Sequence, residues 1–179
     1  MTIGRMLATV LAASISLGFV SSAAAREAEN CANPESGLTG TLTAWAGERA
    51  KAVTAHNAGD VNRTVIAVGK RTSLTMVARG GMQFIMPPEQ KDMPAQYVYS
   101  AMASFKVPKA GIYSVVLSEG MWIDIVQNGA LAKSTTFGRG PACTTIGKKV
   151  EFPLPAGDAV LQLFGAPYAT VDVLIVKAN

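Results

Sequence analysis

The stretch FGRGPACTTIGKKVEF, residues 137–152, contains Cys143, one of only two cysteines in a chain of 179 residues. A cysteine in a glycine-rich loop can serve as a nucleophile, a metal ligand or half of a disulfide. A nucleophilic thiolate needs a neighbouring base, and the only histidine, His56, lies in the distant polar stretch TAHNAGD. Because Cys31 is the one other cysteine, we expect a Cys31–Cys143 disulfide. A free thiol on Cys143 or an intermolecular bridge is the alternative.

The single histidine also limits metal chemistry. Structural zinc sites use four Cys or His ligands, and catalytic zinc usually uses two or three histidines. The facial triad of non-haem iron needs two histidines and a carboxylate. One chain with one histidine cannot supply these sets, so we expect no metal site, no cofactor and no catalytic residues. His56 itself is expected in a solvated loop.

Trp122 and Asp124, in the stretch MWIDIVQ, are the candidates for ligand binding. Residues two apart on a strand point to the same face. On an outer face they would form an aromatic and acidic patch of the kind that binds sugars or peptides, with Arg139 nearby. On an inner face Asp124 would need a buried partner, such as Lys133 or Arg139. Glu119 with Asp124 is the candidate carboxylate pair for glycosidic chemistry.

These residues lie among short runs of branched and aromatic residues that are typical of β-strands. Turn signals separate the runs at intervals of roughly 8–12 residues. The dipeptide Asn128–Gly129 predicts a type I′ hairpin, which requires positive φ at both positions. The expected strands span residues 63–69, 72–78, 82–86, 97–107, 112–118, 121–127, 130–137, 148–154, 159–165 and 170–176.

This pattern indicates an all-β fold, an antiparallel β-sandwich of jelly-roll type with about nine or ten short strands. Barrel closure is the alternative. Alternation puts two apolar sets on one face each: Tyr113, Val115 and Leu117, and Val150, Phe152 and Leu154. Residues 38–57 are ambiguous, because 38–45 suit a strand whereas the alanine-rich 46–56 suit a short helix.

Residues 1–25 have the features of a secretory signal peptide: Arg5, an apolar run over 7–20, and small residues before a cleavage point after Ala25. An uncleaved membrane anchor is the alternative. We expect residues 26–37 to form an irregular segment and residues 38–179 to form a single β-sandwich domain. The mature chain shows no further apolar stretch long enough to span a bilayer. The predicted location is periplasmic or secreted.

The formal net charge of +4 arises from basic residues that are scattered along the chain. Proteins that bind nucleic acid usually cluster such residues in a stripe with aromatic residues between them. We therefore expect no nucleic acid partner.

Residues 107–129, together with GRGPAC (138–143), KKVEFPLPAG (148–157) and LQL (161–163), resemble a family of small secreted bacterial proteins. Some members carry the label homogentisate 1,2-dioxygenase. That activity implies iron held by two histidines and a carboxylate, which His56 alone does not provide. Family members have histidines near the GxGPxC element, where this chain has Phe137 and Arg139. The expected fold is also similar to small β-sandwich domains that accompany secreted peptidases.

The sequence therefore predicts an exported, non-enzymatic β-sandwich that acts as a binding or structural module of the cell envelope. Its partner would be a glycan, a peptide or an envelope protein, bound at Trp122, Asp124 and Arg139. The alternative is an enzyme, such as the dioxygenase that the family label suggests.

Overall fold

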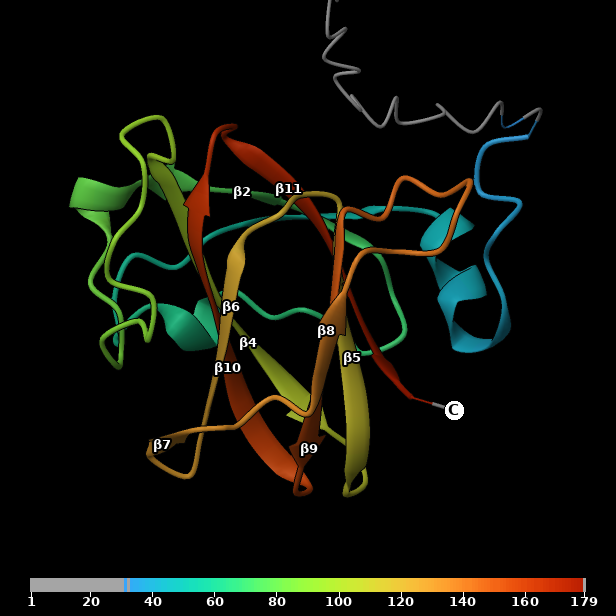
Figure 1. Ribbon diagram of the computed structural model, residues 1–179. Coiled ribbons are helices and arrows are strands. Elements are labelled where there is room, and N and C mark those ends of the chain that lie inside the picture. Colours follow the sequence, from blue (N-terminus) through green and yellow to red (C-terminus); the bar gives the residue numbers. More distant parts are fainter. Residues whose placement is uncertain (1–30, 32, 179) are drawn as a thin grey trace, which may run out of the picture.

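Two β-sheets pack face to face in the computed structural model, which describes residue 31 and residues 33–178 (Figure 1). The six-stranded sheet has the order β1 (Ala50–Val53), β2 (Thr72–Thr75), β11 (Thr170–Lys177), β5 (Gly111–Leu117), β9 (Lys148–Leu154) and β8 (Thr136–Gly138). The five-stranded sheet has the order β3 (Val77–Ala78), β4 (Tyr99–Val107), β10 (Gly157–Ala166), β6 (Trp122–Gln127) and β7 (Ala130–Leu131). The prediction of an all-β sandwich is confirmed.

Neighbouring strands are antiparallel except for β1 and β2, which pair in parallel. From β4 onward the chain passes repeatedly between the two sheets, as the strand orders show. The structure has two distinct sheets rather than one closed barrel. A jelly-roll connectivity stays a prediction.

The inner faces of the two sheets form one apolar core, and strand alternation explains its composition. The two sets expected from the sequence both lie in it: Tyr113, Val115 and Leu117 of β5, and Val150, Phe152 and Leu154 of β9. On β6 the inward residues are Ile123 and Ile125. The core therefore fixes which side chains of each strand point outward.

Several expected elements differ from those observed. Within the ambiguous residues 38–57, residues 40–46 form a 3₁₀ helix, η1 (Gly40–Ala46), and the strand β1 follows it. Residues 63–69 form no strand: Arg63 is the last residue of the short helix η2 (Val61–Arg63), and Val65 makes one isolated bridge, to Ser104. Residues 82–86 follow a third short helix, η3 (Arg79–Gly81), and form no strand.

The predicted hairpin at Asn128–Gly129 is confirmed, with φ values of 53° and 74°. It joins β6 to β7, where Gln127 pairs with Ala130. The expected partner strand over 130–137 is split, because β7 ends at Leu131 and the chain then crosses to the other sheet to form β8.

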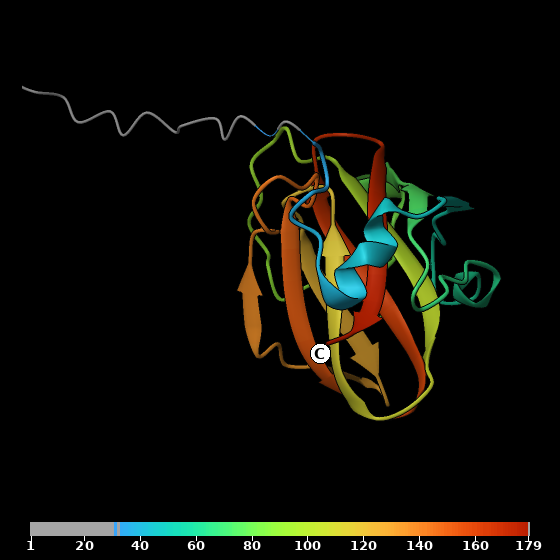
Figure 2. The same ribbon diagram turned by 90° about the vertical axis from the view of Figure 1, so that its right-hand side faces the viewer.

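The N-terminal segment lies on the outer face of the six-stranded sheet, where η1 crosses β11 (Figure 2). Trp45 is fully buried there against Val116, Leu174 and Val176. A disulfide joins Cys31 to Cys143, as the sequence predicted. The predicted signal peptide, together with residues 26–30 and 32 of the irregular segment, falls outside the described residues.

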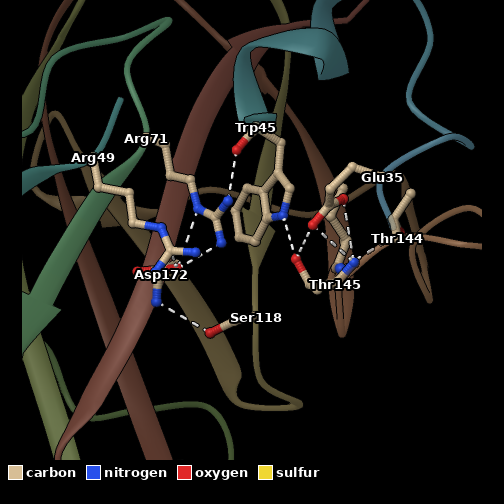
Figure 3. A network of polar contacts seen from close by, with 9 residues as sticks. Glu35, Trp45, Arg49, Arg71, Ser118, Thr144, Thr145 and Asp172 are labelled. Carbon is tan, nitrogen blue, oxygen red and sulfur yellow. Dashed lines mark hydrogen bonds and ion pairs between the residues drawn. The ribbon is translucent and has the colours of Figure 1, made fainter. Parts of the chain in front are cut away.

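A polar network that is buried at Trp45 and Arg71 and reaches the surface at Thr145 fixes η1 to the sheet (Figure 3). The guanidinium of Arg71 lies 4.1 Å from the centre of the Trp45 ring and donates hydrogen bonds to the Asp172 carboxylate at 2.6 and 3.1 Å. The Trp45 indole N–H donates to the hydroxyl of Thr145 at 2.9 Å, and that hydroxyl contacts the Glu35 carboxylate. The network links the N-terminal segment, the sheet and the loop of Cys143.

No helix within the described residues is long and apolar enough to cross a bilayer.

Candidate functional site

Trp122 and Asp124 lie on the outer face of β6, because Ile123 and Ile125 between and beyond them enter the core. The side chains nevertheless are not freely exposed: Asp124 is only 4% exposed and Trp122 is half-buried. The sequence offered two alternatives, an exposed patch on the outer face and a buried acid on the inner face. The structure combines the outer face of the first with the burial of the second. Asp124 is an outward carboxylate that another part of the chain covers.

The covering segment is residues 82–96, which we call the strap; it crosses the outer face of β10 and β6. Gln162 of β10 holds it with two hydrogen bonds to the backbone of Met86, at 3.0 and 3.2 Å. Asp124 of β6 accepts the N–H of Glu89 at 3.2 Å and the indole N–H of Trp122 at 2.7 Å. Both carboxylate oxygens of Asp124 thus have a donor, which satisfies much of its hydrogen-bonding capacity.

A cavity of about 240 Å³ opens beside this carboxylate, between the edge of β6 and the strand β9. Its walls combine apolar side chains with two carboxylates and one ammonium group. They are formed by Glu89, Trp122, Ile123, Asp124, Ala132, Ser134, Phe137, Lys148, Val150 and Phe152. Phe137 is 82% exposed at β8, which is unusual for so large an apolar side chain.

Lys148 supplies the positive charge of the cavity. It shares its strand face with Val150 and Phe152, so its side chain starts on the inner face of β9. The ammonium group donates a hydrogen bond to the Met121 carbonyl at 2.6 Å and lies 5.5 Å from the centre of the Trp122 ring.

Burial shifts the pKa values of both charged groups in opposite directions. Desolvation raises the pKa of the Asp124 carboxyl, although hydrogen bonds from Trp122 and the Glu89 N–H and the charge of Lys148 act against this. Desolvation lowers the pKa of the Lys148 ammonium, and the charge of Asp124 acts against that change. Oppositely displaced groups in one cavity are typical of functional sites, although structural ion pairs show them as well.

The other predicted site residues lie elsewhere. Arg139 is exposed in an adjoining hollow that shares Phe137 and Lys148 with the cavity but does not include Asp124. Glu119 lines that same hollow rather than the cavity of its supposed partner. Lys133 is exposed, and Asp124 is bonded to Trp122 and Glu89 instead of to Lys133 or Arg139.

His56 is exposed in a loop, as expected, and its carbonyl accepts the N–H of Gln83. Both sulfurs of Cys31 and Cys143 are used in the disulfide. Among the side chains that the structure describes, no group of three or more His, Cys, Asp and Glu residues is placed to hold a metal ion.

Glu89, Phe137 and Lys148 line the cavity and were not predicted as site residues. For Lys148 the signal was present, because it continues the period-two apolar set of β9 and must therefore point inward. For Phe137 and Glu89 the sequence gives no such signal, since both reach the cavity through loops and a short strand whose course depends on long-range contacts.

No family model and no curated protein matches this chain. Among solved structures, it is similar to the pre-peptidase C-terminal domain of a collagenase from Bacillus anthracis, with 11% sequence identity and a TM-score of 0.36. The match covers 63% of this chain and 92% of that domain. A similarity of this size assigns no function. The family resemblance of residues 107–163 stays a prediction.

Proposed function

We propose that this protein is an exported, non-catalytic binding module whose ligand enters the cavity beside β6. The observation that carries the proposal is the cavity itself, which has an exposed aromatic ring at its mouth and charges of both signs within. Binding sites are typically concave, mainly apolar and equipped with a few placed polar groups. The disulfide between Cys31 and Cys143 is consistent with an oxidising compartment outside the cytosol.

The role of Asp124 supports binding rather than catalysis. Its two oxygens accept hydrogen bonds from the Trp122 indole and from the strap, so the carboxylate holds the wall of the cavity in place. Phe137 and Glu89 are exposed, and these side chains are available to a partner. We retain the three ligand classes expected from the sequence, namely a glycan, a peptide or a segment of an envelope protein. Arg139 would extend the contact into the adjoining hollow.

The test is a binding screen by NMR titration of the labelled protein against soluble glycans, cell-wall fragments and short peptides. We expect the chemical shifts of the residues that line the cavity to change. We expect Phe137→Ala to lower the affinity for the ligand about ten-fold, as the loss of an aromatic contact residue does. Phe137 is preferable to Trp122 for this test, because the Trp122 indole also supports Asp124.

Ile112→Ala is the matched control, since Ile112 is another exposed apolar residue, 44% exposed, and does not line the cavity. Binding that survives Phe137→Ala unchanged, with shifts away from the cavity, would refute the proposed site.

A further inference from the structure

The edge of β6 that faces the cavity has a backbone position without a strand partner. The pairing of β6 with β7 covers only Val126 and Gln127, and one further bond joins the Ala132 N–H to the Ile125 carbonyl at 2.8 Å. Toward the start of β6 no strand among the described residues pairs on this side. Ile123 is therefore an edge residue that lines the cavity.

Strand geometry shows where the backbone of Ile123 points. In an antiparallel strand the N–H and C=O of one residue point to the same side, and successive residues alternate between sides. Because the Ile125 carbonyl bonds toward β7, the N–H and C=O of Ile123 point the same way, into the cavity, and away from β10. Neither group makes a hydrogen bond to any described residue.

This pair belongs to a residue that has little contact with solvent. Ile123 as a whole is 6% exposed and lines the cavity, and backbone groups in such positions are usually hydrogen-bonded, to protein, to water or to another molecule. The preceding residue on the same side, Met121, is already satisfied, because its N–H bonds to Glu119 and its carbonyl accepts Lys148. One donor and one acceptor thus remain side by side at the cavity wall.

The opposing strand does not offer such a pair. On β9 the residues that face β8 are Lys149, Glu151 and Pro153, given that the Glu151 carbonyl accepts the Thr135 N–H at 2.8 Å. Beyond Glu151 the next residue on this side is Pro153, which has no N–H and so cannot pair with an added strand. The edge of β6 is open to pairing where the edge of β9 is not.

We propose that the cavity binds an extended peptide that pairs with Ile123 as a short added strand. The inference rests on the proposed binding function and names its ligand class. Strand addition of this kind takes its affinity from main-chain hydrogen bonds and its specificity from alternate side chains. A segment of three residues, about 10 Å long, supplies both bonds.

The surroundings define the chemistry of that peptide. Residues opposite each other in a sheet point to the same face, so the residue paired with Ile123 projects between the sheets toward Val150 and Phe152 and should be apolar. Its two neighbours point to the outer face, beside Trp122 and the exposed carboxylate of Glu89. A basic side chain matches that position.

The probe is the capped tripeptide acetyl-Lys-Leu-Lys-amide, titrated into the protein by NMR with the Ile123 amide as the main reporter. We expect saturable shifts at Ile123. N-methylation of the central leucine should weaken binding at least ten-fold, because it removes the donor to the Ile123 carbonyl. The acidic analogue acetyl-Glu-Leu-Glu-amide should bind more weakly than the basic peptide.

On the protein side, Glu89→Gln should weaken the basic peptide several-fold, since the variant removes the charge but keeps the backbone N–H that Asp124 uses. Glu119→Gln, in the adjoining hollow, is the matched control and should not change the affinity. Both substitutions are on the surface of the protein and test the site without altering the core.

The outcomes separate this inference from the proposed function. Glycan binding at the cavity with no response to any peptide overturns the peptide while the binding module stands. Peptide binding that tolerates N-methylation of the leucine overturns strand addition. Shifts of the Ile123 amide with protein concentration alone indicate a second copy on this edge and overturn the peptide as its occupant. If no glycan or peptide binds at the cavity, and Phe137→Ala changes no binding measured anywhere on the protein, both proposals are refuted.

Discussion

Asp124 is a carboxylate that the chain keeps from water on an outer sheet face, by covering it with the strap. Its position beside the Trp122 indole, the Glu89 backbone and the Lys148 charge makes it the link between β6, the strap and the cavity. Desolvation raises the pKa of this carboxyl from a value of 3.8. Because the pKa differs between the folded and unfolded chain, the burial of Asp124 can be measured from how the free energy of unfolding depends on pH.

The sign of that dependence follows from proton binding. Just above pH 3.8 the folded chain holds more protons on Asp124 than the unfolded chain does, so the contribution of Asp124 to the free energy of unfolding falls as the pH rises through this window. We expect the wild type to gain stability relative to Asp124→Asn on acidification from about pH 7 to about pH 4. Urea unfolding of both proteins at each pH measures this.

Asp124→Asn is expected to be less stable at neutral pH for a separate reason, because the asparagine NH2 group meets a donor in either orientation of the amide, the Glu89 N–H or the Trp122 indole N–H. The comparison therefore uses the slope with pH and not the absolute difference. A difference that stays constant over this range, or that shrinks on acidification, would show that the pKa of Asp124 is not raised.

At the scale of elements, the strap replaces a helix or a further strand as the cover of β10 and β6. Gln162, which is 1% exposed, holds it through both polar atoms of its side chain. We expect Gln162→Leu to lower the free energy of unfolding by about 1–3 kcal/mol, since two backbone groups of Met86 lose their partner. Hydrogen exchange should also become faster over residues 84–92.

Gln127→Leu is the matched control for this substitution. Gln127 is likewise buried, but it makes one side-chain hydrogen bond, to Pro155 at 3.0 Å, and its Oε1 has no partner among the described residues. Its replacement should cost less and should leave exchange in the strap unchanged. Equal effects of the two substitutions on the strap would contradict the role assigned to Gln162.

The strands that the sequence predicts well are those whose own alternation decides their burial. β5 and β9 each place three apolar residues on one face, and the hairpin at Asn128–Gly129 depends on local backbone preference alone. Residues 82–86 have an apolar composition that suits a strand, yet the backbone of Met86 is bonded to Gln162, which lies far along the chain. A side chain that replaces a strand ladder leaves no periodic signal in the sequence.

The candidate site, like the fold, was predictable from the sequence only where local strand alternation decides the position of a side chain. Trp122 and Asp124 were recognised because both lie on one strand two residues apart, and the indole does bond to the carboxylate. The cover over Asp124, the exposed Phe137 and the unpaired backbone of Ile123 all depend on where other segments end. Lys148 was not predicted as a site residue, although period two along β9 indicates that it points inward. Among the described residues that line the cavity, it is the one cation.

At the scale of the whole molecule, the N-terminal segment is attached to the sandwich in two independent ways. The disulfide joins positions 112 residues apart in sequence, and Trp45 is fully buried between Arg71 and the outer face of β5 and β11. If the burial of Trp45 is enough to keep the segment in place, loss of the disulfide changes the unfolded chain far more than the folded one. The chain-entropy account puts that change at about 4.7 kcal/mol for a loop of roughly 100 residues.

We therefore expect the double variant Cys31→Ala/Cys143→Ala to keep the native near-ultraviolet circular dichroism of Trp45 while its urea midpoint falls, with a loss of about 2–5 kcal/mol. The m-value should rise, because an unfolded chain without the cross-link exposes more surface.

Trp45→Ala with the disulfide intact is the contrasting variant. It should alter the native spectrum, and its m-value should stay at that of the cross-linked wild type. An unchanged midpoint in the double cysteine variant would mean that the bond contributes nothing to stability. A changed native spectrum would mean that the disulfide, and not the Trp45 network, positions the segment against the sheet.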